Sequence, residues 1–139
     1  MISYNFENDF TIQNESNFNN WIESVVISES KTVGELNFIF CNDDYLLDIN
    51  NQFLDHDYYT DIITFDYCVG NELSGDIFIS TQRVQENSSE FSVTFDNELL
   101  RVISHGVLHL CGYKDKNSED IEEMRRKENE KIELFHVEQ

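Results

Sequence analysis

The sequence predicts an α+β fold in which a small mixed four-stranded sheet packs with about five helices. Strand-like and helix-like segments alternate in the first half of the chain, whereas only helical patterns follow residue 80. The 139 residues contain no proline, no Gly/Ser-rich linker and no internal repeat. We therefore expect a single domain over residues 1–139.

The first half of the chain contains four strand-like segments. Residues 2–6 (ISYNF) and 33–40 (VGELNFIF) alternate apolar and polar side chains well enough to form strands. Residues 60–67 (TDIITFDY) and 73–80 (LSGDIFIS) form two more, and Gly-Asn at 70–71 favours a turn between them. These segments supply the four strands of the predicted sheet.

Two helices are expected between these strands. Residues 17–30 carry apolar side chains at helical spacing, namely Phe18, Trp21, Ile22, Val25 and Val26. Residues 43–54 (DDYLLDINNQFL) form a short helix that Asn42 can cap, because a side-chain oxygen at this position can accept from a free backbone N–H group. Both helices can cover the sheet that the strands on either side of them form.

Three helices are expected in the second half, over about 81–91, 94–111 and 118–135. The Thr94 hydroxyl can cap the middle helix, and acidic residues in its first turn suit the positive end of the helix dipole. The last helix begins with acidic residues and gains basic ones later, which matches the dipole again. The middle helix carries a broad apolar face, made by Leu99, Val102, Ile103, Val107 and Leu110. We therefore expect it to be the central helix.

The chain is strongly acidic, with 28 acidic and 9 basic residues and a formal net charge of −19. Residues 1–82 contain 15 acidic residues and one basic residue, Lys31, so the imbalance is greatest in the first half. Phosphate backbones bind through Lys and Arg, so the composition disfavours a general nucleic-acid binder. A role on RNA would need a local basic patch, bound metal ions or a partner protein.

The composition also indicates the compartment. No apolar run approaches the roughly 18 residues of a membrane span, and the N-terminal residues lack the basic start and apolar block of a signal peptide. Cys41, Cys68 and Cys111 are odd in number and far apart, as expected of reduced thiols rather than a disulfide framework. We expect a cytoplasmic protein without a membrane partner.

The stretch HGVLHLCGYKDK, residues 105–116, predicts a metal site at the C-terminal end of the central helix. His105 and His109 are four residues apart and lie on one side of a helix, where two imidazoles can reach one ion. Gly112 suits the left-handed position that ends a helix, and the reversed chain can bring Asp115 back toward the histidines. Two histidines and one carboxylate leave a coordination position for water, which suits a catalytic metal. A core helix that carries two histidines without a metal is the alternative.

Gly106 separates this motif from the zinc peptidases. In the H-E-x-x-H motif of those enzymes the residue after the first histidine is a glutamate that acts as general base. A mid-helix glycine costs about 1 kcal/mol relative to alanine, so Gly106 is expected to serve close packing or access. The motif therefore argues against proteolysis.

HGVLHLCGY, together with TDIITF and SGDIFIS upstream, resembles the YbeY family of metal-dependent endoribonucleases. The resemblance covers nearly the whole chain. It implies a hydrolase with one zinc ion in which a metal-bound water attacks a phosphodiester of single-stranded RNA. It also implies roles in 3′ maturation of the small-subunit ribosomal RNA and in ribosome quality control, with the small ribosomal subunit and assembly proteins as partners and without DNA.

Carried over by residue, His105 and His109 match the first two metal ligands of the family. Asp115 stands where the family has a third histidine, and Lys114 replaces the aspartate before it. A carboxylate can bind zinc at about 2.0–2.2 Å, so Asp115 is the expected third ligand. Its negative charge should make a bound water less acidic, or favour Mn²⁺ or Fe²⁺ over Zn²⁺.

The second departure from the family pattern is the loss of two positively charged residues. Leu54 stands where the family commonly has an arginine, and His56 stands where it has a lysine. His56, Lys114 or Lys116 are candidates to replace that arginine, although an exposed loop histidine is the favoured interpretation of His56. The general base and the other catalytic residues stay open.

Three further residues are expected to be structural. Asp61 is interpreted as a cap or turn acid, Asp76 as a strand-end acid near the site, and Cys111 as a core residue off the ligand face of the helix. Two alternatives to the endoribonuclease remain at this point. One is a non-peptidase metallohydrolase of another ester or amide, and the other is a non-catalytic ribosome-assembly protein with a structural metal.

Overall fold

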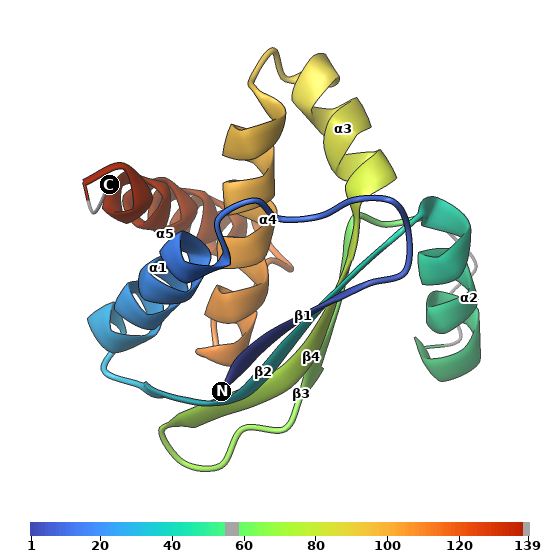
Figure 1. Cartoon of the computed structure of the whole chain (residues 1–139). Coiled ribbons are helices and arrows are strands. Elements are labelled where there is room, and N and C mark those ends of the chain that lie inside the picture. The colour runs from blue at the N-terminus through green and yellow to red at the C-terminus, as the bar shows by residue number, and fades with distance from the viewer. Residues whose placement is uncertain (55–58, 138–139) are drawn as a thin grey trace.

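The computed structural model describes residues 1–54 and 59–137 and contains one four-stranded sheet (Figure 1). Across the sheet the strands are β1 (Ile2–Phe6), β2 (Thr32–Cys41), β4 (Glu72–Ser80) and β3 (Ile62–Asp66). The first three are mutually parallel, and β3 is antiparallel to β4. The sheet is therefore mixed, as predicted, and the Gly-Asn turn joins β3 to β4.

Helices cover both faces of this sheet (Figure 1). On one side lie α1 (Glu15–Ser28), α4 (Phe95–Leu110) and α5 (Ser118–Val137), and on the other lies α2 (Asp43–Leu54). The fifth helix, α3 (Thr81–Glu90), packs against α4 beyond the end of the sheet. The α+β fold with a mixed four-stranded sheet and five helices is thus confirmed for the described residues. None of the helices within 1–54 and 59–137 is long and apolar enough to cross a membrane.

The first turn of α2 follows β2 after Asn42, the residue predicted to cap this helix. The backbone oxygen of Asn42 accepts a hydrogen bond from the backbone N–H of Leu46, as at a helix start. Its side-chain oxygen accepts one from the amide of Asn8, 3.0 Å away. Asn42 therefore also ties the loop after β1 to the start of α2.

The main core lies between the sheet and α4. Alternate residues of β4, including Ile77 and Ile79, are fully buried on this side, and they pair across the sheet with Phe38 and Phe40 of β2. Residues paired in register share one face of a sheet, so these four side chains form a continuous apolar surface under α4. It is this surface that fixes where α4 lies.

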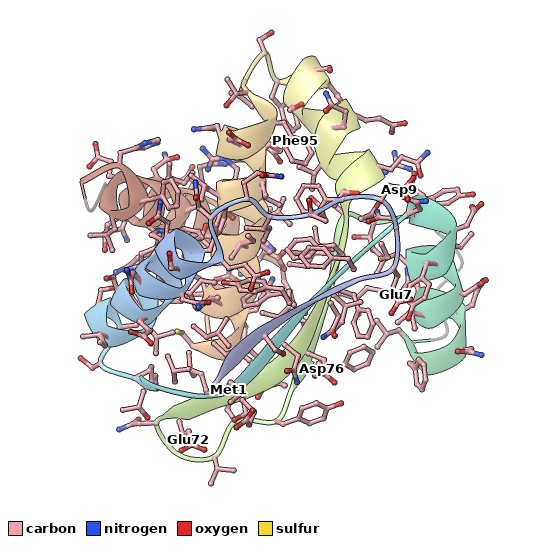
Figure 2. All side chains as sticks on the ribbon, in the orientation of Figure 1. Met1, Glu7, Asp9, Glu72, Asp76 and Phe95 are labelled. Atoms are coloured by element: carbon pink, nitrogen blue, oxygen red, sulfur yellow. The ribbon has the colours of Figure 1, made fainter. Side chains whose placement is uncertain are left out.

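Both ends of α4 have specific caps. At the N-terminus Thr94 Oγ1 accepts a hydrogen bond from the N–H of Asn97, as predicted. At the C-terminus Gly112 has φ +106°, and the N–H of Tyr113 donates to the oxygen of Leu108 at 3.1 Å. This is a Schellman motif, which needs a left-handed residue at the glycine position. The chain therefore reverses at Gly112, as the sequence predicted. The helix begins at Phe95, on the same side of the molecule as Asp9, and runs toward the end that carries Met1 (Figure 2).

A buried ion pair joins α5 to α1. Lys131 of α5 is fully buried, and its Nζ donates to Glu29 Oε2 at 2.6 Å and to Ser28 Oγ at 2.8 Å. Glu29 Oε1 accepts from the hydroxyl of Tyr113 at 2.7 Å. Burial alone would raise the pKa of Glu29, but the hydrogen bonds from Lys131 and Tyr113 outweigh it and lower the pKa. The cluster thus ties the loop after α4 to two other helices.

Replacing Lys131 with alanine is expected to lower the free energy of unfolding by about 2 kcal/mol, because it removes the charged hydrogen bonds to Glu29 and Ser28 and leaves Lys127, 3.3 Å away, as the remaining cation beside Glu29. Urea denaturation measures the change. The double variant Lys131→Ala/Glu29→Ala should lose less than the sum of the two single variants, since each single change already breaks the pair. Additive losses would contradict the predicted coupling.

Candidate metal centre

His105, His109 and Asp115 come together at the end of α4. The two Nε2 atoms of the histidines are 2.9 Å apart. Asp115 Oδ2 lies 3.3 Å from Nε2 of His105 and 3.4 Å from Nε2 of His109. Helical spacing brings the histidines together, and the turn at Gly112 returns Asp115 to them, so the three residues form one group of possible metal ligands.

This arrangement fits a small divalent ion. With metal–nitrogen bonds of about 2.0–2.1 Å and tetrahedral geometry, two ligand atoms lie about 3.3–3.4 Å apart. Both distances to Asp115 match this separation, and the distance between the nitrogens is somewhat shorter. Two imidazole nitrogens and a carboxylate oxygen are also a donor set that zinc accepts while keeping a position for water.

The other nitrogen of each imidazole is held by an acceptor. Nδ1 of His109 lies 2.9 Å from the backbone oxygen of Tyr113. Nδ1 of His105 lies 2.6 Å from Oε2 of Glu128. A carbonyl oxygen only accepts, so Nδ1 of His109 carries the proton, and in the neutral imidazole the lone pair of Nε2 is available to a metal ion. Glu128 favours the same tautomer in His105, an arrangement common around zinc ligands.

Glu128 is itself held in place by Arg101. The Glu128 side chain is 6% exposed, and its Oε1 accepts from Nη1 of Arg101 at 3.0 Å. The second arm of Arg101 donates to Oδ1 of Asn129 at 2.9 Å. A chain of hydrogen bonds therefore runs from α5 through Arg101 and Glu128 to His105, and it fixes the orientation of this imidazole.

Charges around the cluster change the pKa of its neighbours. Burial tends to lower the pKa of His105, but the hydrogen bond and charge of Glu128, helped by Asp115 and Asp61, raise it overall. Burial raises the pKa of Asp61, which the nearby His105 partly offsets. Glu98 is 4% exposed, and burial raises its pKa as well. The site therefore consists of two imidazoles surrounded by acidic side chains, and the protein partly encloses it.

Two surface hollows meet at the cluster. The first, here called the α2-side hollow, has a volume of about 430 Å³ and is lined by α2, β3 and the end of α4. The second, the α5-side hollow, has a volume of about 380 Å³ and extends from the cluster between α3, α4 and α5. Asp61, Ile62, His105 and Asp115 line both. The candidate ligands thus lie on the floor of an extended depression.

The residues expected to supply a cation lie in different places. Leu54 lines the α2-side hollow and is 40% exposed. His56 lies outside the described residues. Lys114 faces a separate hollow beside Glu29 and Tyr113, so it does not line either hollow at the cluster. The cationic residues that do line one of the two hollows are Arg101 and Arg125.

Two of the residues expected to be structural are placed differently from the prediction. Asp76 lies within β4 and accepts a hydrogen bond from Asn37 at 2.9 Å. Because side chains alternate along a strand, Asp76 faces away from α4, so its expected position near the site is wrong. Asp61 directly precedes β3, where a turn acid would lie, but it also lines both hollows beside His105, a position that the prediction did not include.

Cys111 and Gly106 agree with their predicted structural roles. Cys111 packs against the core, and burial raises the pKa of its thiol to about 11. A Cβ at Gly106 would lie 2.9 Å from Cδ1 of Ile62 and 3.1 Å from Cγ2 of Ile77. Gly106 therefore allows close packing of α4 on the sheet, one of its two expected roles.

The sequence interpretation missed Glu128, although a signal for it exists. Along α5 the buried residues Met124, Glu128, Lys131 and Ile132 recur at helical spacing. Two charged residues on such a buried stripe indicate that each has a buried partner. The partners themselves, His105 and Glu29, lie 23 and 102 residues earlier in the chain and follow only from the folded structure.

Together, the fold and the cluster define a small α+β protein with a candidate centre for one metal ion at the end of its central helix. Comparison with protein-family models is more specific: the model of the family Endoribonuclease YbeY matches residues 3–136. The chain therefore belongs to the YbeY family of endoribonucleases, as the resemblance in its sequence indicated.

Individual relatives agree with this assignment. The chain is 56% identical to Endoribonuclease YbeY of Flavobacterium johnsoniae over 139 residues, which is 100% of both chains. It is 57% identical to Endoribonuclease YbeY of Flavobacterium psychrophilum over 139 residues, or 100% of this chain and 99% of the relative. The solution structure of TM1509 from Thermotoga maritima matches with a TM-score of 0.73 and 32% identity, covering 99% of this chain and 91% of that one.

Replacing His109 with alanine is expected to abolish zinc binding, because it removes one of three ligand atoms. Glu128→Gln should weaken zinc binding by about 10–100-fold, since it loosens the orientation of His105 without removing a ligand. Competition with a chelating dye measures both. Glu133→Gln, at an exposed position on the same helix, serves as control. Equal affinities for the Glu128 and Glu133 variants would contradict the role of Glu128.

The imidazole of His105 is expected to titrate above its usual pKa of about 6.5 in the metal-free protein, because Glu128 stabilises its charged form. The stability from this pair is fully present below the unfolded pKa and is lost as the pH rises through the folded pKa. Zinc binds neutral imidazole, so zinc affinity should instead fall as the pH decreases through the same range. NMR titration of His105, with Glu128→Gln expected to lower its pKa, tests the shift; an unshifted wild-type value would contradict it.

Proposed function

We propose that this chain, acting as one domain over residues 1–139, is a metal-dependent endoribonuclease specific for single-stranded RNA. Its proposed task is the 3′ maturation of small-subunit ribosomal RNA and ribosome quality control. The observation that carries the proposal is the convergence of two Nε2 atoms and Asp115 Oδ2 at the place where two hollows meet, with His105 and Asp115 lining both and His109 lining the α2-side hollow. Membership of the endoribonuclease YbeY family over residues 3–136 supports the choice of RNA as substrate.

The residues proposed to hold the metal are His105, His109 and Asp115. A bound zinc ion would lower the pKa of a coordinated water and neutralise charge on a phosphodiester. Zinc is the first choice because the imidazole nitrogens suit it. Manganese or iron(II) is the second, since the carboxylate of Asp115 adds a hard oxygen ligand.

In this proposal the chain's own residues orient the metal ligands, transfer a proton and bind the RNA strand. Glu128 and the carbonyl of Tyr113 orient the two imidazoles. The half-buried Asp61 lies beside His105, where a carboxyl group with a raised pKa is suited to accept or donate a proton. Two hollows that meet at the cluster suit an extended strand, with chain on both sides of the cleaved bond, better than a compact small substrate.

The negative net charge of the chain affects how it can meet its RNA substrate. A net charge of −19 repels free RNA, and steering toward phosphates falls with negative charge. We therefore place the reaction in the cytoplasm on the small ribosomal subunit, where assembly proteins would help to present the RNA. Because the RNA would be presented on the subunit, the chain would not need a general affinity for nucleic acid.

Cleavage of labelled single-stranded RNA, compared with the same RNA in a duplex, tests the proposal. Removal of metal by a chelator should abolish cleavage, and zinc or manganese should restore it. Asp115→Ala should lower the rate by about 100-fold or more, as expected when the protein loses a ligand of the ion that would stabilise transition-state charge. Asp115→His, which restores a nitrogen ligand, should keep metal bound.

Glu119→Ala provides the matched control, because Glu119 is an exposed acidic residue four positions further along the chain than Asp115 and lines neither hollow. Its activity should equal that of the unaltered chain. Full activity of Asp115→Ala would overturn the assignment of the third ligand. A protein that binds zinc and co-sediments with small ribosomal subunits but never cuts RNA would instead be an assembly factor with a structural metal.

A further inference from the structure

The two hollows at the metal cluster differ in their charge. Residues 32–82, which include all of α2, β3 and the loop between them, contain no lysine or arginine. The other residues that line the α2-side hollow are His105, His109, Leu110 and Asp115. Among the described residues, no lysine or arginine therefore lines this hollow, and its basic side chains are the imidazoles of His105 and His109. A phosphate on this side would meet the carboxylate of Asp66, together with those of Asp61 and Asp115, which line both hollows.

The α5-side hollow carries two arginines, Arg101 and Arg125. They are not equivalent. The Arg101 side chain is 17% exposed, and its two arms are held by Glu128 at 3.0 Å and Asn129 at 2.9 Å. It therefore serves the hydrogen-bond chain to His105. The Arg125 side chain is 56% exposed, and its Nη1 reaches Oε1 of Glu128 only at 4.0 Å. A long ion pair at such an exposed position holds a guanidinium weakly.

Four acidic residues line the α5-side hollow, Asp61, Glu98, Asp115 and Glu128, and they compete little for Arg125. Asp61 accepts a hydrogen bond from Asn87, and burial raises its pKa. Glu128 is shared between Arg101 and His105. Glu98 is almost fully buried, and burial raises its pKa. Asp115 turns its Oδ2 toward the two histidines. The guanidinium of Arg125 thus remains accessible to an anion that enters the hollow.

We propose that Arg125 is an RNA-binding residue whose guanidinium contacts a phosphate of the strand lying across the cluster of His105, His109 and Asp115. Guanidinium groups bind phosphate oxygens with two parallel hydrogen bonds. The strand then places a phosphate next to the cleaved one in the α5-side hollow. The less polar parts of its nucleotides lie toward Leu54 and Ile63 in the α2-side hollow. This inference rests on the proposed function, because it assumes that RNA crosses the cluster.

The neighbouring residue provides a matched control. Arg126 is on the same helix, its side chain is 65% exposed, and it pairs with Glu123 at 3.4 Å. It does not line the α5-side hollow. Arg125→Ala and Arg126→Ala therefore remove the same charge from adjacent positions, and only the first removes it from the hollow.

Binding of a short single-stranded 2′-O-methyl oligoribonucleotide, which resists cleavage, tests the inference by fluorescence anisotropy on the zinc-loaded protein at several salt concentrations. Arg125→Ala should weaken binding several-fold and reduce the slope of log K against log salt by about 0.7, the value for one phosphate contact on a single strand. Arg126→Ala should leave the slope unchanged. Arg125→Lys should keep the slope but bind more weakly than the unaltered chain, because an ammonium cannot form the paired hydrogen bonds.

The outcomes separate this inference from the proposed function. Equal effects of Arg125→Ala and Arg126→Ala, or no effect of either, overturn the role of Arg125 even if the unaltered protein cuts RNA. If the unaltered protein binds the oligonucleotide but does not cut the corresponding RNA, the proposed catalysis fails, and the difference between the two variants still decides the role of Arg125. Absence of binding by the unaltered protein overturns the role of Arg125, whereas the proposed function is still decided by the cleavage of RNA. Unchanged zinc content and thermal unfolding of Arg125→Ala show that a weaker affinity comes from the lost contact.

Discussion

The close packing of α4 on the sheet is the constraint on which the rest of the structure depends. At Gly106 there is no room for a Cβ atom without a shift of Ile62 or Ile77, so the helix approaches β3 and β4 closely at the position between the two histidines. The apolar surface of β2 and β4 holds the helix there. As a result, His105 and His109 lie directly beside the start of β3 and beside Asp61. A helix displaced outward by a larger side chain would carry the histidines away from this edge.

The C-terminal end of α4 is then fixed by contacts from three other segments. Gly112 reverses the chain, and Tyr113 links the following loop to Glu29 at the end of α1. The carbonyl of Tyr113 orients His109, so the same residue serves the fold and the imidazole. On the other side Glu128 of α5 orients His105. Both candidate ligands on the helix are therefore held through partners from distant parts of the chain. Such rigid support is what a centre needs to keep its ligand atoms at fixed distances.

An acidic protein that belongs to an endoribonuclease family poses an electrostatic problem. Most of its negative charge lies in the first 82 residues, whereas eight of its nine basic residues come later. The structure brings two of these later residues, Arg101 and Arg125, to one side of the cluster. A bound divalent ion would add positive charge at the centre itself, where the shared walls of the two hollows are acidic. The balance of positive and negative charge at the site can thus differ from that of the whole chain.

The amino-acid sequence alone determined the secondary structure, the mixed sheet and the three candidate ligands. Each of these follows from short-range patterns: alternation in strands, helical spacing, the cap at Thr94, and the i,i+4 histidines followed by Gly112. Local patterns could not reveal the face on which Asp76 would lie, the approach of Asp61 to His105, or the partners of Glu128 and Lys131. Those depend on the register of the sheet and on where α5 crosses α1 and α4. The fold brings these residues together because buried charged groups must find partners, and the partners lie on segments far apart in the chain.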